Sequence, residues 1–393
     1  MKEKTLLLIG LGALGHQTLQ ILSRTPTISE GIDKIIAADV NEKVGRRRTN
    51  LALLTAKHLG FHPHLEFTRL DLLDVDHTTE MLCNIDPDLI FSAVSLLTWW
   101  IPEYLPKDRA DRFAVAGLGP FLPMHLALLY NLVRAIQRSN IDATLVNASF
   151  PDATAPILNN FGLPYLVGVG NIANLITPIK WVASQKLKMP MRDIIVFMVC
   201  HHFVAHAVAT YGCTMGAPYY LKIIANGKDV TDKVDSEQKL IEKNIGLPKI
   251  PFGVERNSLI AATAVKVLRG ILQDTNEITH APGPNGLIGG YPVRVSRESV
   301  EVVLPKELNL AKALKINTEG QKYDGIKEIK KDGTVVLTEK SRRIISEELG
   351  YDLKSFKPDE SEKLAGEIGE AFKAYGAKWG LPDFALKAIW TKK

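Results

Sequence analysis

The chain has 393 residues, of which 46% are hydrophobic and 23% are charged, so its length and composition suit two soluble globular domains. The net charge of +5 comes from basic residues spread along the sequence, which argues against a nucleic-acid-binding protein. The three cysteines lack CxxC or disulfide-framework spacing, and no apolar run is long enough to cross a bilayer, so we expect a cytoplasmic protein with no signal peptide and no membrane partner.

The chain opens with a predicted buried strand that runs into a glycine-rich turn. Residues 5–9 (TLLLI) form a continuous apolar run that ends at Gly10, and a helix is expected over 13–24. In the segment GLGALG, Gly10 permits the tight turn, Gly12 lets the backbone approach a pyrophosphate, and Gly15 lets the helix pack close to the strand. This strand–turn–helix context favours a dinucleotide site over a purely structural glycine turn.

The next predicted strand, 34–39, supplies an acidic residue for the dinucleotide site. It ends in Asp39, 24 residues after Gly15, where a carboxylate accepts hydrogen bonds from the adenosine ribose. The carboxylate would repel a 2′-phosphate, so we expect NAD. The arginines at 46–48, either a solvated helix start or a 2′-phosphate site, keep NADP as the alternative. The residues assigned to the cofactor are Gly10, Gly12, Ala13, Leu14, Gly15, Asp39, Val40, Ser92, Ala93, Val94 and Asn147.

Strands and helices alternate through the first half of the chain. Predicted strands at 5–9, 34–39, 65–70, 88–94 and 143–146 are separated by predicted helices at 13–24, 43–59, 78–85 and 124–138, with an irregular stretch at 96–123. This order implies a parallel sheet with right-handed crossovers. We therefore predict an α/β protein with an N-terminal, doubly wound Rossmann domain over 1–150 and a C-terminal α+β catalytic domain over 151–393.

The second half of the chain carries the candidate acid–base group. Further predicted elements are strands at 165–168, 193–199, 291–295 and 299–304, helices at 174–187, 258–272 and 359–376, and a glycine-rich loop from His280 that either leads into a strand or closes over substrate. Strand 193–199 ends in Cys200-His201-His202. Histidine exchanges protons near neutral pH, as alcohol oxidation beside a nicotinamide requires. We favour His202 over His201 for this role; the alternative is that one ring packs in the core and the other faces solvent.

The order of these landmarks resembles the lactate/malate dehydrogenase superfamily, which also includes the NAD-dependent family 4 glycosidases. The resemblance covers about residues 5–305 and rests on GLGALG with Asp39, the strand ending in Asn147, the Gly168-Val-Gly170 turn, the strand ending in His202 and the YPVRV strand. It implies an NAD-dependent dehydrogenase that acts on a small polar alcohol or keto compound, with a histidine as acid and base.

The same resemblance implies roles for polar residues around the histidine. Asn147, after the fifth strand, is expected to bond cofactor and substrate, and Asn174 stands where the family has the aspartate that orients its histidine. Thr177 occupies the position of the family's substrate-binding arginine, so another basic residue is expected to bind an anionic group of the substrate. Lys180 and Arg256 are the candidates for this role, and Asn171 is a further candidate substrate-binding residue.

Two other functions stay open. One is an NAD- and metal-dependent glycoside-processing enzyme, in which Cys200, His201, His202 and His206 would surround the metal. We expect no metal, because Gly170-Asn171 stands where those glycosidases have a metal-binding cysteine. The other is a non-catalytic dinucleotide-binding sensor, for which the histidines would be incidental.

A second resemblance is confined to about the first 100 residues of the chain. Residues 70–76 and the strand DLIFSAV at 88–94 resemble saccharopine-dehydrogenase-like reductases, which supports a cofactor domain without defining the chemistry. We expect a small-molecule substrate and a homo-oligomer, either a dimer or a tetramer.

Overall fold

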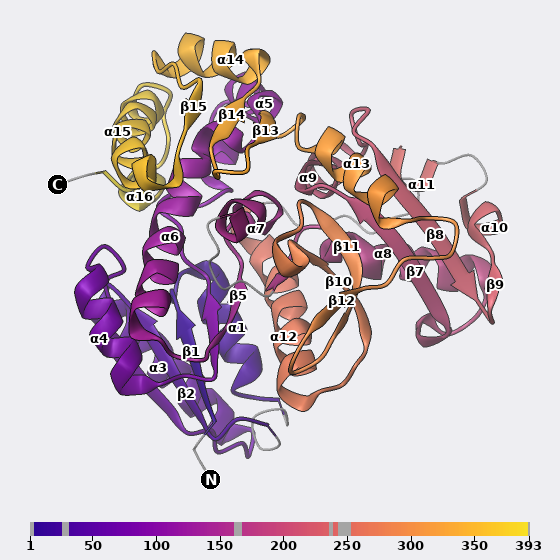
Figure 1. Ribbon diagram of the computed structural model, residues 1–393, viewed down its shortest axis with the longest axis horizontal. Coiled ribbons are helices and arrows are strands. Elements are labelled where there is room, and N and C mark those ends of the chain that lie inside the picture. The colour runs from indigo at the N-terminus through magenta and orange to yellow at the C-terminus, as the bar shows by residue number, and fades with distance from the viewer. Residues whose placement is uncertain (1–3, 26–30, 161–166, 236–238, 243–252, 392–393) are drawn as a thin grey trace.

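The computed structural model describes residues 4–25, 31–160, 167–235, 239–242 and 253–391. Figure 1 shows three groups of elements: a parallel sheet with its helices at lower left, an antiparallel sheet with its helices at right, and a group of C-terminal helices and short strands at upper left. We call this last group the C-terminal cap (residues 321–391).

The six strands of the first sheet are all parallel and follow the order β3-β2-β1-β4-β5-β6. The strands are β1 (Thr5–Ile9), β2 (Lys34–Asp39), β3 (Leu65–Arg69), β4 (Leu89–Ser92), β5 (Thr144–Asn147) and β6 (Val167–Gly168). The helices that connect them include α1 (Ala13–Leu22), α3 (Glu42–His58), α4 (Val75–Ile85), α6 (Leu122–Ser139) and α7 (Pro151–Asn160). The predicted α/β fold with a Rossmann sheet is confirmed. Its strand order reverses between β1 and β4, the place where such sheets bind ligands at the carboxyl ends of their strands.

The second sheet is antiparallel, with the order β10-β11-β7-β8-β9 and β12 paired to β11. Its strands are β7 (Ile194–Cys200), β8 (Tyr219–Ala225), β9 (Lys228–Asp229), β10 (Ile278–Pro282), β11 (Gly290–Val295) and β12 (Val300–Val302). The helices of this region are α8 (Ala173–Leu187), α9 (His202–Tyr211), α10 (Thr231–Asp235), α11 (Lys239–Glu242), α12 (Asn257–Gln273) and α13 (Leu310–Gly320). Helix α12 packs along α1, and one buried cluster joins Leu6 of β1, Leu268 of α12 and Val293 of β11. The division into domains at residue 150 stays a prediction.

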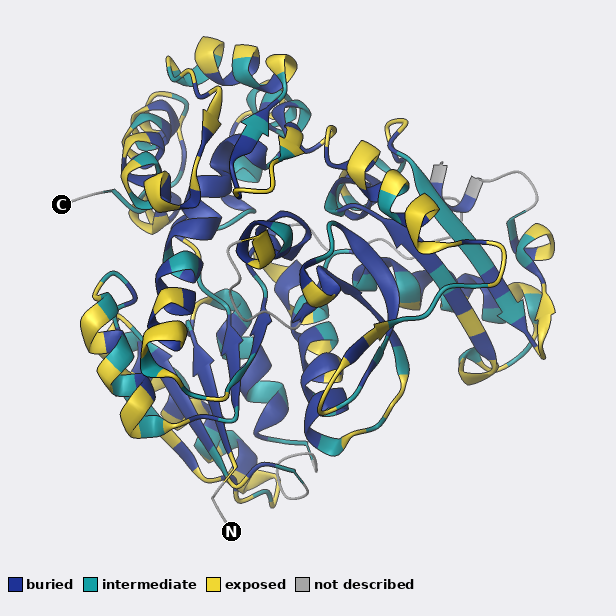
Figure 2. Ribbon diagram, viewed as in Figure 1, coloured by how far each residue is buried: buried dark blue, intermediate teal, exposed yellow. Residues whose placement is uncertain are grey.

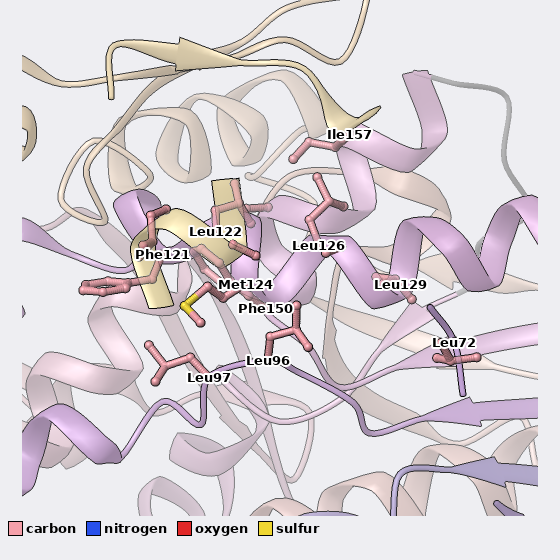
Figure 3. Close-up of a cluster of buried hydrophobic side chains, with 14 of the residues drawn as sticks. Leu72, Leu96, Leu97, Phe121, Leu122, Met124, Leu126, Leu129, Phe150 and Ile157 are labelled. Atoms are coloured by element: carbon pink, nitrogen blue, oxygen red, sulfur yellow. The ribbon is translucent and has the colours of Figure 1, made fainter. Parts of the chain in front are cut away.

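The C-terminal cap packs on the N-terminal half of the chain. It contains β13 (Ile326–Ile329), β14 (Val335–Leu337), β15 (Ser355–Phe356), α14 (Glu339–Leu349), α15 (Ser361–Lys378) and α16 (Asp383–Ala388). Helix α15 packs against α6, and α14 packs against α5 (Lys107–Ala116). The ring of Phe372 lies 5.4 Å, between centroids, from those of Phe113 and Phe121. Figure 3 shows the part of this cluster around the start of α6, including Leu96, Leu97, Phe121, Leu122 and Met124.

Two local expectations are wrong. Residues 96–123 are not irregular throughout, because η1 (Ile101–Tyr104), α5 and η2 (Gly119–Phe121) occupy much of this stretch. His280 lies in β10 rather than in a loop, and its Nε2 accepts a hydrogen bond from the N–H of Met198 at 3.2 Å. His280 therefore belongs to the sheet, and the glycine-rich loop begins only after Pro282 and leads into β11, as expected. The remaining 3-10 helices are η3 (Met191–Asp193), η4 (Gly253–Arg256), η5 (Pro284–Gly286) and η6 (Pro358–Glu360).

Burial follows these layers, as Figure 2 shows. The strands of the parallel sheet are mostly buried, and exposed residues gather on the outer faces of the helices. Among the described residues, no single helix is long and apolar enough to cross a membrane; α5 and the segment 119–139 pass that test only together, as a pair bent by 81°.

Candidate active site

A cavity of about 720 Å³ joins the glycine-rich turn to the predicted histidine. Gly12 and Asp39 line it from the parallel sheet, and His202 lines it from the start of α9. The C-terminal cap contributes Glu362 and Trp390. Small-molecule and cofactor sites have volumes of roughly 300–1,000 Å³, so this cavity has the size of a ligand site. Three regions that are distant in sequence therefore meet at one cavity.

The glycine-rich turn has the geometry that a bound dinucleotide needs. Gly10 has a φ of +91°, and a Cβ there would lie 2.7 Å from the carbonyl oxygen of Ala93. A Cβ on Gly15 would lie 1.8 Å from the carbonyl oxygen of Gly10, so only glycine lets α1 start this close to β1. By contrast, nothing lies within 4 Å of a Cβ on Gly12, and no side chain caps the N-terminus of α1. A pyrophosphate fits here, because the free N–H groups at the helix start favour an anion.

Asp39 lines the cavity at the end of β2 and also braces the turn. Its two carboxylate oxygens accept backbone N–H groups, one of them from Leu11 at 2.7 Å. A carboxylate has further lone pairs, so Asp39 is also able to accept ribose hydroxyls. Of the predicted arginines, Arg46 pairs with Glu42 at 2.9 Å, and Arg48 donates to the carbonyl oxygen of Leu11. Both of these arginines are thus engaged with the protein itself.

A carboxylate from a distant part of the chain holds the ring of His202. The Nδ1 atom of His202 lies 3.0 Å from Oδ2 and 3.1 Å from Oδ1 of Asp324. The Nδ1 atom of His201 lies 2.9 Å from Oδ2 of the same carboxylate, so Asp324 joins the two histidines. The rings of Phe150 and His206 flank His202, with centroids 5.0 and 6.0 Å away. Because Asp324 engages Nδ1, the Nε2 atom of His202 is the nitrogen left for a ligand.

Asp324 reaches the histidines because two glycines let its backbone pass close to the segment before α6. Gly117 has a φ of +76°, and a Cβ there would lie 2.3 Å from the carbonyl carbon of Asp324. The N–H of Gly119 donates to the carbonyl oxygen of Asp324 at 2.7 Å. Nearby, the hydroxyl of Ser341 on α14 donates to the carbonyl oxygen of Ala116. The sequence Gly117-Leu-Gly119 is therefore one of the places where the C-terminal cap contacts the rest of the chain.

The buried groups of the site differ in their electrostatics. Burial lowers the pKa of His202, but the charge and the hydrogen bond of Asp324 outweigh this effect and hold the pKa above its ordinary value of 6.5. Burial raises the pKa of Asp324, but His202 and His201 together hold it well below its usual range. Burial lowers the pKa of His125 and of His206 to about 3. Of the three histidines that line the cavity, His202 is thus the one suited to exchange protons near neutral pH.

Comparisons with known proteins place this architecture among solved structures. No protein-family model matches the sequence, and no curated protein matches it in sequence. The lactate dehydrogenase from Eimeria maxima with NADH and oxamate matches with a TM-score of 0.55 and 12% identity, over 82% of this chain and 92% of that chain. The apo malate dehydrogenase from Picrophilus torridus matches with a TM-score of 0.52 and 17% identity, over 82% and 97%. The chain has the lactate and malate dehydrogenase fold.

A third structure with this dehydrogenase fold is MGS-M5, a lactate dehydrogenase from a Medee basin deep-sea metagenome library. It matches with a TM-score of 0.51 and 14% identity, over 82% of this chain and 97% of that chain. Each match covers nearly the whole of the solved dehydrogenase chain, whereas part of the present chain lies outside the match. The resemblance derived from the sequence is confirmed for the fold.

Within the dehydrogenase fold, the asparagines predicted around His202 have other partners. The expected hydrogen bond between Asn174 and His202 is wrong, because Oδ1 of Asn174 is buried with no hydrogen-bond partner and Asp324 holds the histidine. Asn174 and Asn171 both line the cavity. Asn171 donates to the carboxylate of Asp152, whose pKa is raised by burial.

Other predicted residues do not line the cavity. Asn147 is buried, and its Nδ2 donates to Oγ1 of Thr154 and to the carbonyl oxygen of Ser149, each at 3.1 Å. Its amide therefore stabilises the turn after β5. His201 is fully buried, with Nε2 unpartnered. The predicted residues outside the cavity lining are Gly15, Ser92, Asn147, Lys180 and His201, whereas Ala13, Leu14, Val40, Ala93 and Val94 line it.

Of the two predicted cations, Arg256 reaches the cavity and Lys180 does not. The guanidinium of Arg256 lies 3.8 Å from the carboxylate of Glu103 and 4.8 Å from the ring centroid of Trp99. Lys180 lies on α8, where burial, together with the charge of Lys266, lowers its pKa. Of the two, Arg256 is therefore the cation placed where a ligand in this cavity could contact it.

Sequence reasoning missed three residues of the site. Asp324 follows a helix without any periodic pattern, so no local signal in the sequence marks it as a partner of His202. His125 and Ser149 form a buried pair, with Nδ1 and Oγ 3.2 Å apart, and the hydroxyl of Ser149 donates to the carbonyl oxygen of His125. The Nε2 atom of His125 has no partner. Over the described part of the chain, no group of three or more His, Cys, Asp or Glu side chains is placed to hold a metal ion.

Proposed function

We propose that this protein is an NAD-dependent oxidoreductase that transfers a hydride between nicotinamide and a small polar alcohol or its keto form, with His202 as acid and base. The observation that carries the proposal is the pairing of His202 with Asp324 at a cavity that also contains the glycine-rich turn. Oxidation of an alcohol needs a base within hydrogen-bond reach of the hydroxyl, and a histidine oriented by a carboxylate is such a base.

The residues of the parallel sheet that line the cavity fit NAD. The open backbone at Gly12 and the uncapped start of α1 would hold the pyrophosphate, and Asp39 would bind the adenosine ribose. Ala93 and Val94, which follow β4, continue the wall from the turn. NAD is favoured over NADP because the charge of Asp39 opposes a 2′-phosphate and Arg46 is paired with Glu42. When bound, NAD supplies the hydride acceptor.

His202 and its neighbours would then move the proton. Nε2 of His202 takes the hydroxyl proton during oxidation, and Asp324 holds the proton on Nδ1 and stabilises the imidazolium that forms. His201 is assigned a positioning role, because its Nδ1 contacts the same carboxylate and its ring does not line the cavity. Arg256 would bind an anionic group of the substrate.

The proposal is tested by incubating the protein with NAD and a panel of hydroxy acids and other polar alcohols while following the absorbance of the reduced nicotinamide. His202→Asn should lower kcat by about 10² or more, the usual contribution of a general base, while NAD binding stays unchanged. His62→Asn is the matched comparison, because His62 is exposed and does not line either cavity, and it should retain the activity of the wild type. Equal kcat in His202→Asn and the wild type would contradict the role of His202 and favour the metal-dependent glycoside-processing enzyme. No reduction of NAD with any alcohol of the panel would favour the non-catalytic sensor.

We further propose a homo-oligomer that works in the cytoplasm. Leu51 and Leu54 on α3 have exposed fractions of 51% and 58%, which supports a contact between subunits there. The three cysteines are free thiols, as is usual in a reducing compartment. Light scattering coupled to size-exclusion chromatography measures the oligomeric state. Leu54→Glu should convert the oligomer to a monomer, and a monomeric wild type would contradict the proposed oligomer.

A further inference from the structure

A second cavity, of about 390 Å³, adjoins the first one at His202. The residues that line both cavities are Trp99, Leu118, His202, His206, Ala209 and Arg256. A molecule whose reacting group lies at His202 therefore has room to continue into the second cavity. The volume is itself within the range of small-molecule sites, roughly 300–1,000 Å³, whereas a substrate with a methyl side chain would leave it empty.

Most of the inner wall of the second cavity is apolar, although the largely buried carboxylates of Glu103 and Asp324 also line it, and we call this cavity the apolar chamber. Phe113 and Phe121 line it from the region of α5, and Phe203 lines it from α9. These three rings have exposed fractions of 4% or less, so they form a rigid, buried wall. The rim is charged: Lys107 pairs with Asp111 at 2.6 Å, and the Lys107 side chain is 83% exposed. The chamber thus has one end near solvent and the other at the acid–base histidine.

Charged groups concentrate where the two cavities meet. Glu103 accepts the N–H of Gly253 at 3.1 Å through one oxygen, and its other oxygen, Oε1, lies 3.8 Å from Nη2 of Arg256. Both side chains are largely buried, with exposed fractions of 10% for Glu103 and 7% for Arg256. An anionic head group would therefore be recognised at this junction, close to His202, while the chamber beyond it offers mainly apolar contacts.

We infer that the substrate carries a bulky apolar group, branched or aromatic, that fills the apolar chamber while its anionic group lies at Arg256 and its reacting oxygen lies at Nε2 of His202. This inference rests on the proposed function and narrows its substrate class. Each buried methylene favours binding by roughly fourfold, so a large apolar group gains a strong preference over a methyl group. The class that fits is an oxo acid or hydroxy acid with a large hydrocarbon side chain.

The test compares three 2-oxo acids that share one head group: pyruvate, 4-methyl-2-oxopentanoate and phenylpyruvate. The two measurements are NADH-dependent reduction and calorimetric binding to the NADH-saturated protein. We expect kcat/KM to be about tenfold or more higher for each of the two larger acids than for pyruvate. Ala114→Phe on α5 places a ring in the chamber and should remove most of this preference, and Ala110→Phe serves as a second variant of the same kind. Ala311→Phe, at an exposed position of α13, is the matched control.

The outcomes separate the inference from the proposed function. Equal kcat/KM for the three acids, or an unchanged preference in both α5 variants with wild-type melting temperatures, would overturn the apolar chamber as a substrate site and leave the oxidoreductase standing. Phenylpyruvate that binds to the wild type but not to Ala114→Phe, without being reduced, would support the chamber and contradict the proposed reaction. If none of the three acids binds or is reduced, the inference is overturned.

Discussion

The carboxylate of Asp324 lies 3.0 Å from Nδ1 of His202, although 122 residues separate them in the sequence. The histidine begins α9, and the aspartate belongs to the C-terminal cap. Asp324 has an exposed fraction of 2%, so its charge acts on the imidazole with little screening by water. The C-terminal cap is thus part of the candidate active site and not a peripheral addition to the fold.

Replacing Asp324 by asparagine should lower activity and shift its pH dependence. Neutral His202 is the form that accepts a proton, so alcohol oxidation by the wild type should rise as the pH passes through a pKa above 6.5. Asp324→Asn removes the negative charge that raises this pKa, so the rise should move to lower pH, with a loss in kcat of roughly tenfold or more. The profile of kcat/KM against pH checks this, with the exposed Asp142→Asn as control. If the inflection of this profile lies at the same pH in Asp324→Asn as in the wild type, a group other than His202 titrates.

The three histidines that line the cavity should titrate differently. The pKa of His202 should lie above the ordinary value of 6.5. Burial lowers the pKa of His125 and of His206 to about 3, so these two rings should stay neutral near neutral pH. NMR of ring-labelled histidine, with one histidine replaced in each variant, assigns the signals. A resonance from His206 that titrates near neutral pH would contradict the site as described.

Gly117→Ala should disturb the docking of the C-terminal cap. Alanine is strained at a φ of +76°, and its Cβ would lie 2.3 Å from the carbonyl carbon of Asp324. Gly60→Ala is a matched control, because Gly60 has a φ of +82° with nothing within 4 Å of a Cβ. We expect Gly117→Ala to lower the free energy of unfolding by roughly 1–3 kcal/mol more than Gly60→Ala, the usual cost of overpacking. Urea unfolding measures the difference, and kcat should fall only in Gly117→Ala.

Arg256→Gln should weaken the binding of anionic substrates, whereas Lys180→Gln should not. Arg256 lines the cavity and Lys180 lies outside it. A hydrogen bond to a charged group contributes roughly 1.5–3 kcal/mol, so kcat/KM for an anionic substrate should fall about tenfold or more in Arg256→Gln. Reduction of a neutral ketone by the same variant controls for changes in folding. A larger loss in Lys180→Gln would show that the anion lies elsewhere.

Asp39→Asn should reduce the preference for NAD over NADP. The substitution keeps a group that can accept a hydrogen bond at the end of β2 but removes the charge that opposes a 2′-phosphate. We expect weaker NAD binding and an NADP affinity that is unchanged or higher, with kcat unaffected at saturating cofactor. Fluorescence titration with both reduced cofactors measures the two dissociation constants. Tighter binding of NADP than of NAD by the wild type would mean that Arg47 and its neighbours outweigh Asp39.

Local sequence patterns alone predicted the elements that carry the glycine-rich turn and the histidine. The run 5–9, the glycines after it and the run ending in Asp39 are contiguous, and their conformations follow from local rules for buried strands and tight turns. The strand that ends before the histidine pair was predicted in the same way, because its residues form a continuous apolar run; the structure has it as β7, of seven residues. These features depend on neighbours within a few residues of each other, so the sequence by itself was sufficient.

The partners of these groups depend on contacts between distant segments, and no local pattern encodes such contacts. Asn174 resembles the family's orienting residue by position, yet Asp324 occupies that role because Gly117 and Gly119 let the C-terminal cap approach. Arg256 reaches the cavity and Lys180 does not, although the sequence offered both as candidates for the same role. Tertiary packing alone decided which polar side chains share a buried cavity, since burial brings together groups whose separation along the chain exceeds the range of any periodic signal.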